Sequence, residues 1–285
     1  MMLKFLRAKL RGGAGDLARE SGDYWSMSDV NERVRDQSHW FGEGRWGRER
    51  WLAYGDFFFD LACGRIREAG GEDWLAELEG KTALEWGCGG GAITRSLGDR
   101  FGFVYGLDIS AATLRECGKR MGEFSGRGNA GAARGYGAAN RPAGPNRAGN
   151  FRTLLIPAAE PEAVLRTIPP GSVDFIVSIG VFKHFPSRDY TGRVLRIMAQ
   201  LLKAGGFLFV QIRYFDGEEK YRSKDRDYAR NVITMTSFTG PEFAARIEDA
   251  GLVLRHREQD GDGEEEHHAY YLLSKVERHL PAGVS

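Results

Sequence analysis

The stretch Thr82-Ala-Leu-Glu-Trp-Gly-Cys-Gly-Gly-Gly91 decides the fold of this chain. Its apolar run carries an acidic residue, Glu85, and is followed by glycines at every second position. The next residues, Ala92–Leu97, start a predicted helix. A strand, a glycine loop and a helix in this order let a backbone approach a ligand closely at the carboxyl end of a parallel strand. The stretch therefore predicts a ligand-binding unit of parallel α/β type.

A second apolar run, Phe103–Leu107, ends in Asp108 about one strand–helix–strand unit later. A carboxylate at the tip of a second parallel strand is placed to accept hydrogen bonds from the hydroxyls of a ribose. The glycine spacing alone also fits the dinucleotide-binding fingerprint G-x-G-x-x-G, because that fingerprint tolerates an alanine at its third position and Ala92 stands there. Spacing alone therefore leaves both kinds of cofactor open.

Leu84–Gly91, followed by Gly106–Ser110, resembles the first two motifs of the class I S-adenosylmethionine-dependent methyltransferases. An acidic residue two positions before the first glycine, here Glu85, favours these enzymes over the dehydrogenases. The resemblance implies an α/β fold with a Rossmann-like, seven-stranded, mostly parallel sheet in the strand order 3-2-1-4-5-7-6. It also implies helices on both faces of the sheet, an N-terminal helical lid and S-adenosylmethionine as the cofactor.

The resemblance further implies which residues bind the cofactor. They are Glu85, Gly87, Cys88, Gly89 and Gly91 at the first strand, Asp108 and Ile109 at the second, Ala159 and Glu160 at the third, and Ser178 and Ile179 at the fourth. Asp108 is expected to hold the ribose, and Glu85 to order the loop or to reach the cofactor's amine. After the third strand the family has an acidic residue that contacts the adenine amine. Here that acid is either absent or replaced by Glu160 in a shifted turn.

The run Ser172–Ile179 is almost continuously apolar, as a strand buried on both faces requires. Its exit, Ser178–Phe185, is similar to the family segment that touches the methionine part of the cofactor and ends in a histidine. His184 is the candidate catalytic base for a hydroxyl acceptor, because an imidazole titrates near neutral pH. The alternative is that His184 only packs or caps the turn. No acidic residue ends this strand, and no metal site is expected.

Residues 1–19 form a basic N-terminal tail, in which residues 1–15 either touch an anionic membrane surface weakly or fray. Residues 20–80 are rich in aromatics and are expected to form the helical lid, with a helix from Ser28 to Val34 and a longer one over Glu49–Ala69. Most of these aromatics are expected to pack onto the core. In the segment Trp40–Trp46, the guanidinium of Arg45 is a candidate for holding the cofactor's carboxylate.

Residues 81–276 form the predicted methyltransferase domain, and residues 277–285 a C-terminal tail. The domain is interrupted at residues 124–150 by an insertion of mainly Gly, Ala, Asn and Arg. Such a composition buries too little apolar surface to order itself, so we expect a flexible loop. The fifth strand is expected over Phe207–Ile212, after a stop at Lys203–Gly206, and a closing hairpin over Leu252–His256 and Ala269–Leu273.

The 285 residues have a hydrophobic content of 42%, which supports a buried core, and a formal net charge of +1, which gives no argument for nucleic acid. Three cysteines without paired spacing suggest neither disulfides nor zinc, so we expect a reduced, cytoplasmic setting. No apolar run is long enough to span a bilayer. The pattern does not indicate an oligomeric state.

The expected function is transfer of a methyl group to a small-molecule, glycan or lipid-linked acceptor, at oxygen. A second possibility is an NAD(P)-dependent oxidoreductase, which would need a Tyr-x-x-x-Lys pair or similar machinery for hydride transfer. A third is a non-enzymatic or RNA-directed member of the methyltransferase fold, which would use the arginines of the insertion.

Overall fold

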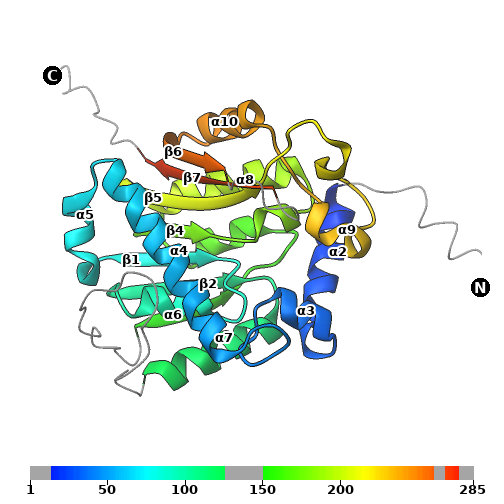
Figure 1. Cartoon of the computed structure of the whole chain (residues 1–285), viewed down its shortest axis with the longest axis horizontal. Helices are drawn as coiled ribbons and strands as arrows, with labels where there is room; N and C mark the ends of the chain where they lie inside the picture. Colours follow the sequence, from blue (N-terminus) through cyan, green and yellow to red (C-terminus); the bar gives the residue numbers. More distant parts are fainter. Residues whose placement is uncertain (1–13, 126–149, 260–266, 276–285) are drawn as a thin grey trace, which may run out of the picture. The chain divides into compact units, whose positions relative to one another are not determined.

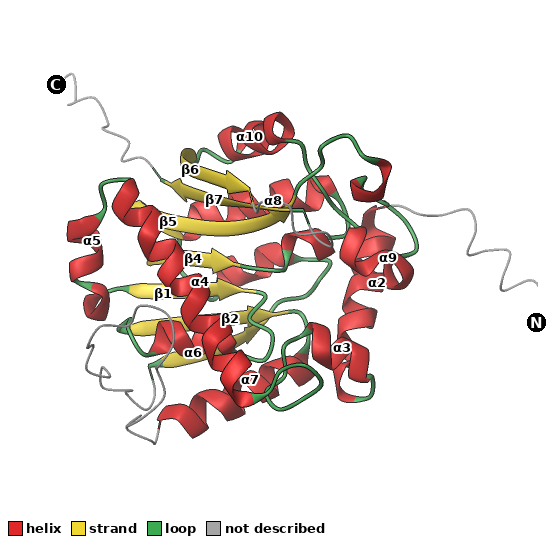
Figure 2. Cartoon of the chain, in the orientation of Figure 1, coloured by secondary structure: helices red, strands yellow, loops and turns green. Residues whose placement is uncertain are grey.

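The computed structural model describes residues 14–125, 150–259 and 267–275 (Figures 1 and 2). Its chain divides into two compact units, residues 28–155 and residues 1–27 together with 156–285. The seven strands lie in the order β3-β2-β1-β4-β5-β7-β6. The predicted α/β fold, with a mostly parallel sheet in this order, is therefore confirmed. The predictions for the basic residues 1–13, for the insertion and for residues 277–285 fall outside the described residues, apart from the ends of the insertion.

The unit of residues 28–155 holds three parallel strands. They are β1 (Thr82–Trp86), β2 (Phe103–Asp108) and β3 (Phe151–Leu155). Helix α6 (Ala92–Gly98) packs on β1 and β2, and α7 (Ala111–Ser125) packs on β2 and β3. The parallel register pairs Glu85 with Gly106, so both strands end at the same edge as the glycine loop.

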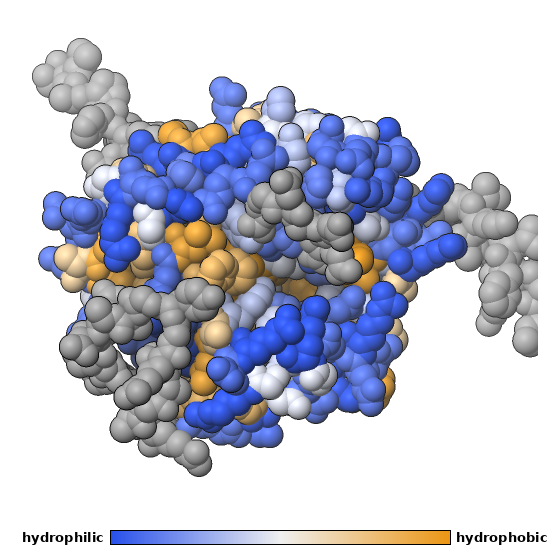
Figure 3. All heavy atoms as spheres, viewed as in Figure 1, coloured by the Kyte–Doolittle hydropathy of each residue, from blue (hydrophilic) through white to orange (hydrophobic). Residues whose placement is uncertain are grey.

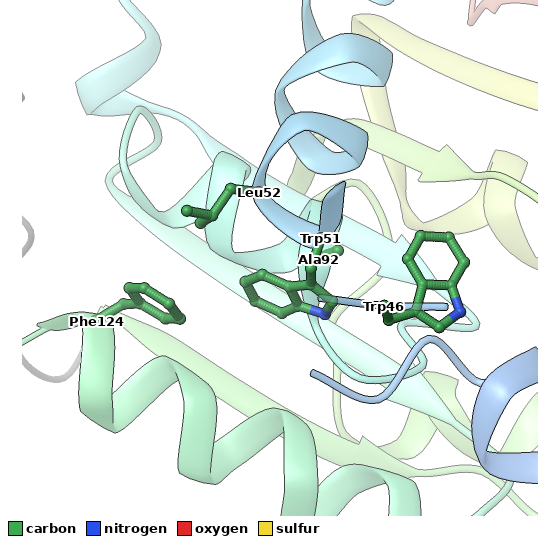
Figure 4. Packing of buried hydrophobic residues seen from close by; sticks show 5 residues of the cluster. All are labelled: Trp46, Trp51, Leu52, Ala92 and Phe124. Atoms are coloured by element: carbon green, nitrogen blue, oxygen red, sulfur yellow. The ribbon is translucent and has the colours of Figure 1, made fainter. Parts of the chain in front are cut away.

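Helix α4 (Arg48–Glu68) lies across α6 in the same unit, and it confirms the predicted long helix. Trp51 on α4 is fully buried and stacks on Phe124 of α7, with ring centroids 5.6 Å apart. Figure 4 shows Trp51 between Phe124 and Trp46, in a cluster that also includes Leu52 and Ala92. The prediction that most of these aromatics pack onto the core is thus confirmed here. Phe57 on the same helix is an exception at 59% exposed. Figure 3 shows apolar side chains gathered in a band on one face of the molecule.

The helix predicted from Ser28 is wrong. Helix α3 spans Glu32–Gln37 and is capped by Asn31, whose side chain accepts hydrogen bonds from the backbone N–H groups of Arg33 and Val34. The hydroxyl of Ser28 does not cap a helix but lies buried 3.0 Å from that of Ser110. A serine and an asparagine are equally good N-caps in sequence, so packing decides between them.

The other unit holds β4 (Val173–Ser178) and β5 (Leu202–Arg213) in parallel, followed by β7 (His268–Ser274) and β6 (Val253–Gln259) in antiparallel pairing. The predicted closing hairpin is therefore confirmed. Strand β5 begins at Leu202, not at Phe207 as predicted, because Val173 pairs with Leu202 before a register shift leads to the pair Phe175–Phe207. The glycines of the expected stop thus lie within the strand.

The described residues of this second unit include four helices. Helix α8 (Arg188–Leu201) packs on β5, and α10 (Gly240–Asp249) packs on α8 and β6. Helix α2 (Ala14–Ser26), which the sequence did not indicate, packs on the short α9 (Tyr228–Asn231). The shorter elements of the described part of the chain are η1 (Met27–Asp29), α5 (Glu72–Ala76), η2 (Leu78–Gly80), η3 (Pro161–Arg166), η4 (Phe182–His184), η5 (Glu219–Tyr221) and η6 (Val232–Thr234). Among the described residues, no helix is long and apolar enough to cross a membrane.

Helix α4 approaches α6 most closely at Gly55. A Cβ at this position would lie 2.1 Å from the carbonyl oxygen of Ala92, so Gly55→Ala forces the two helices apart. We expect the variant to lose roughly 1–3 kcal/mol of unfolding free energy, measured by urea denaturation. Gly64→Ala on the same helix is the matched control, because a Cβ there meets nothing within 4 Å. The unfolding free energy of Gly64→Ala should rise by roughly 0.5–1 kcal/mol. Equal changes in unfolding free energy for the two variants would contradict the close packing of α4 on α6 at Gly55.

Candidate active site

The glycine loop that follows β1 is fastened to the end of β2. The carbonyl oxygen of Leu107 accepts hydrogen bonds from the backbone N–H groups of Gly87 and Cys88, at 2.7 and 2.8 Å. Gly87, Gly89 and Gly91 all have positive φ angles, of 78°, 51° and 92°. Side chains other than that of glycine rarely adopt this left-handed conformation, so the loop's path depends on these glycines.

Asp108, at the end of β2, is tied to the same loop. Its Oδ2 accepts a hydrogen bond from Gly89 N at 3.1 Å, and its Oδ1 accepts one from Ser110 N at 2.9 Å. Burial raises the pKa of Asp108 to about 6, although the hydrogen bonds from the backbone of Ser110, Gly89 and Ile109 act in the opposite direction. The carboxylate expected to hold the ribose therefore also holds the loop.

Glu85 is the second carboxyl group of this site and is only 3% exposed. The hydroxyl of Thr94, in the first turn of α6, donates a hydrogen bond to Glu85 Oε2. Burial raises the pKa of Glu85 to about 8; the hydrogen bonds from Thr94 oppose this shift, and the nearby charge of Asp108 adds to it. Of the two roles expected for Glu85, this geometry supports ordering the loop.

Cys88 and Gly91 face α7. The thiols of Cys88 and Cys117 are hydrogen-bonded to each other, and this bond together with burial raises the pKa of the Cys88 thiol. A Cβ at Gly91 would lie 2.9 Å from the sulfur of Cys117. The side chain of Cys88 therefore belongs to the core, and only its backbone lines the loop.

A segment of the chain that precedes α4, residues 38–46, covers the glycine loop; we call it the covering segment. The backbone N–H of Gly90 donates to the carbonyl oxygen of Ser38 at 2.6 Å. A Cβ at Gly89 would lie 2.6 Å from that oxygen, and a Cβ at Gly90 would lie 2.3 Å from the carbonyl oxygen of His39. These two glycines are thus required for packing within the protein.

Arg45 makes its contacts within the N-terminal part of this unit. Its guanidinium lies on the covering segment, but its Nε pairs with the carboxylate of Asp36 at 3.2 Å. The same guanidinium lies over the ring of Trp46, 5.3 Å from the centroid. Arg45 therefore helps to order the covering segment, and its role toward the cofactor's carboxylate stays a prediction.

In the unit that contains β4, Ser178 and Ile179 end the strand and are buried. The backbone N–H of the next residue, Gly180, donates to Gln211 Oε1 at 2.8 Å. Gln211 Nε2 in turn donates to the hydroxyl of Tyr270 at 3.0 Å. This buried network fixes the exit of β4. Gln211 could not be identified from the sequence, because its hydrogen-bond partners, Gly180 and Tyr270, are distant in sequence and become neighbours only in the folded sheet.

His184 ends η4 in the same unit. Its Nδ1 lies 2.7 Å from the carbonyl oxygen of Val232. A carbonyl can only accept, so Nδ1 carries the proton and the basic lone pair is on Nε2. The ring of Trp25 lies edge-on to the imidazole, with the two ring centroids 5.1 Å apart. The indole N–H of Trp25 donates a hydrogen bond to the hydroxyl of Tyr228, and this hydroxyl donates to the backbone oxygen of His184. The sequence places Tyr228 near the presumed substrate, but it does not show that Trp25 and Tyr228 meet, since 203 positions separate them.

After β3, Ala159 and Glu160 are exposed. The carboxylate of Glu160 pairs with Arg166 at 2.8 Å, and this hydrogen bond lowers the pKa of Glu160. The carboxylate of Glu160 therefore already has an ion-pair partner, Arg166. The described residues contain no group of three or more His, Cys, Asp or Glu side chains that could hold a metal ion.

A Tyr-x-x-x-Lys spacing does occur once in the sequence, at Tyr271 and Lys275. These residues lie on and just after β7, where four residues span about 13 Å instead of one helical turn. Tyr271 is 1% exposed, and the Lys275 ammonium donates to the carbonyl oxygen of Leu202 at 2.9 Å. The spacing therefore does not form a pair for hydride transfer.

Residues 84–208 match a family model described as a methyltransferase domain. The chain carries a class I S-adenosylmethionine-dependent methyltransferase domain. The match includes the glycine loop, Asp108 and the exit of β4. The protein is thus a methyltransferase, with S-adenosylmethionine as its cofactor. No curated protein sequence matches the chain.

Solved structures share the fold at low sequence identity. Magnesium protoporphyrin IX methyltransferase from Synechocystis PCC 6803 with bound S-adenosylmethionine is 13% identical, with a TM-score of 0.53 over 93% of this chain and 98% of that one. A methyltransferase from Leishmania major is 14% identical, with a TM-score of 0.50 over 95% and 89%. The [4+2]-cyclase SpnF is 12% identical, with a TM-score of 0.52 over 82% and 84%. These likenesses show the fold alone, and they do not identify the acceptor.

The buried carboxyl groups make the stability of this methyltransferase depend on pH. The pKa of Glu85 is about 8 in the folded protein, against 4.5 for an ordinary glutamate, so between these values the folded state binds more protons than the unfolded state. Stability should therefore fall as pH rises from 5 to 8, and Glu85→Gln should flatten that fall in urea denaturation. Glu160→Gln, at an exposed site, is the control and should keep the wild-type slope between pH 6 and 8. If wild type and both variants show the same dependence of unfolding free energy on pH, the buried carboxyl group of Glu85 is not the cause of that dependence.

Proposed function

We propose that this methyltransferase acts at oxygen of a small-molecule, glycan or lipid-linked acceptor, with His184 as the general base. The observation that carries the proposal is the hydrogen bond between His184 Nδ1 and the Val232 carbonyl. It holds the imidazole in the tautomer whose Nε2 is basic. The three cysteines are buried thiols that are not joined in disulfides, which supports the proposed cytoplasmic setting.

On the cofactor side, we assign the ribose to Asp108, whose carboxylate is already held by the backbone of Gly89 and Ser110. Gly87 and Gly89 give the loop its left-handed turns, and Glu85 fastens the loop to α6. Ser178 and Ile179 are assigned to the methionine part by the family resemblance, and Ala159 and Glu160 to the surroundings of the adenine. The bound cofactor supplies an electrophilic methyl group on a sulfonium.

The work left to the protein is to align the acceptor and remove its proton. A hydroxyl is a weak nucleophile, so a base that takes its proton as the new C–O bond forms contributes about 10²–10⁴-fold. When bound, S-adenosylmethionine would supply the methyl group and leave as a neutral thioether that keeps the electron pair of the C–S bond. His184 Nε2 would take the acceptor's proton. Trp25, Tyr228 and the Val232 carbonyl hold the histidine in one orientation, which limits the reorganisation that this step requires.

Asp108→Asn tests the cofactor assignment. Loss of the charge should weaken S-adenosylhomocysteine binding by about tenfold to a hundredfold, because hydrogen bonds to a charged group contribute about 1.5–3 kcal/mol. Isothermal titration calorimetry measures the affinity, and circular dichroism checks that the fold survives. Asp174→Asn is the control, since this buried carboxylate near the start of β4 pairs with Lys203. Unchanged affinity in Asp108→Asn would remove the assignment.

His184→Asn tests the base. We expect the turnover number to fall by about 10²–10⁴-fold, while S-adenosylhomocysteine binds as it does to wild type. The assay is formation of S-adenosylhomocysteine during a screen of hydroxyl-bearing acceptors. His256→Asn, on the edge strand β6, should keep wild-type turnover. If His184→Asn turns over at the wild-type rate on the same acceptor, His184 is a structural residue.

A further inference from the structure

Three tryptophans lie in or next to the covering segment, and they differ in whether the indole N–H has a hydrogen-bond partner. Trp46 Nε1 donates to the carbonyl oxygen of Asp36 at 2.6 Å, and Trp51 Nε1 donates to that of His39 at 3.0 Å. Trp40 Nε1 is also buried, yet it has no hydrogen-bond partner among the described residues. Trp40 is therefore the exception among three neighbouring indoles.

Such an exception needs an explanation. The great majority of buried polar groups in folded proteins have a hydrogen-bond partner, and a buried donor without one destabilises the fold. The indole N–H is a donor only, so nothing but an acceptor satisfies it. An acceptor that arrives with a ligand would do so.

The backbone of Trp40 rests on the cofactor loop. A Cβ at Gly90 would lie 3.0 Å from the Cα of Trp40, and Gly90 N donates to the carbonyl oxygen of Ser38 two residues earlier. Between them, His39 has a φ of 57°, a left-handed conformation that is costly for a residue with a side chain. The covering segment thus holds Trp40 in a fixed place against the loop.

We propose that the indole N–H of Trp40 donates a hydrogen bond to the α-carboxylate of the bound cofactor. This inference rests on binding of S-adenosylmethionine at the glycine loop. The carboxylate is the strongest acceptor on the cofactor. Asp108 accepts hydrogen bonds itself and cannot donate one when ionised, and Glu85 is bonded to Thr94. Among the nearby cations, Arg45 pairs through its Nε with Asp36. Trp40 thus takes the role that the sequence suggested for Arg45.

The test compares two ligands that differ in the carboxylate alone. Isothermal titration calorimetry gives the affinities of wild type and Trp40→Phe for S-adenosylhomocysteine and for its decarboxylated analogue, S-adenosyl-3-thiopropylamine. We expect Trp40→Phe to bind S-adenosylhomocysteine about tenfold or more weakly and to bind the analogue within twofold of wild type. Trp40→Met, which also lacks a hydrogen-bond donor, serves in the same way if the phenylalanine variant does not fold.

Trp46→Phe is the matched control, because it removes an indole whose N–H already has a partner. It should lower the melting temperature and leave the preference between the two ligands at the wild-type ratio. An equal loss of affinity for both ligands in Trp40→Phe, or no loss for either, would overturn the assignment of Trp40. If wild type binds neither ligand, the cofactor assignment fails as well.

Discussion

The carbonyl oxygen of Leu107 receives two backbone hydrogen bonds, from Gly87 and Cys88, and the glycine loop depends on this contact. The end of β2 thereby sets where the chain leaves β1. The carboxylate of the next residue, Asp108, accepts a hydrogen bond from the backbone N–H of Gly89, so β2 also holds the loop two residues further along. One strand end thus positions both the loop and the carboxylate assigned to the ribose. Preorganisation of this kind lowers the entropic cost of binding a cofactor.

The glycines serve two purposes that the sequence pattern does not separate. Positive φ angles at Gly87, Gly89 and Gly91 shape the loop, as the motif implies. Gly89 and Gly90 are also small because the carbonyl groups of Ser38 and His39 lie where their Cβ atoms would be. The covering segment is therefore as dependent on the loop as the cofactor is. Within residues 28–155, the backbone assigned to the cofactor thus also packs against the covering segment.

Much of the fold could be predicted from the sequence, because apolar runs that end in Glu85-Trp86 and Asp108 are typical of buried parallel strands. The start of α3 and the start of β5 could not, since both depend on which of several adequate local signals tertiary packing selects. The glycine loop, Asp108 and His184 could be named from motifs. The contacts of Trp25, Tyr228 and Gln211 could not be predicted, because each residue acts through a partner far away in the sequence.

The central claim is that the loop between β1 and α6, held by Leu107 and Asp108, binds an adenosyl sulfur compound and not a nicotinamide dinucleotide. Parallel calorimetric titration of the purified protein with S-adenosylmethionine, S-adenosylhomocysteine and NAD tests it most directly. The account predicts saturable binding of the first two, with one site per chain, and no heat of binding for NAD. Binding of NAD alone, or of none of the three, would contradict it.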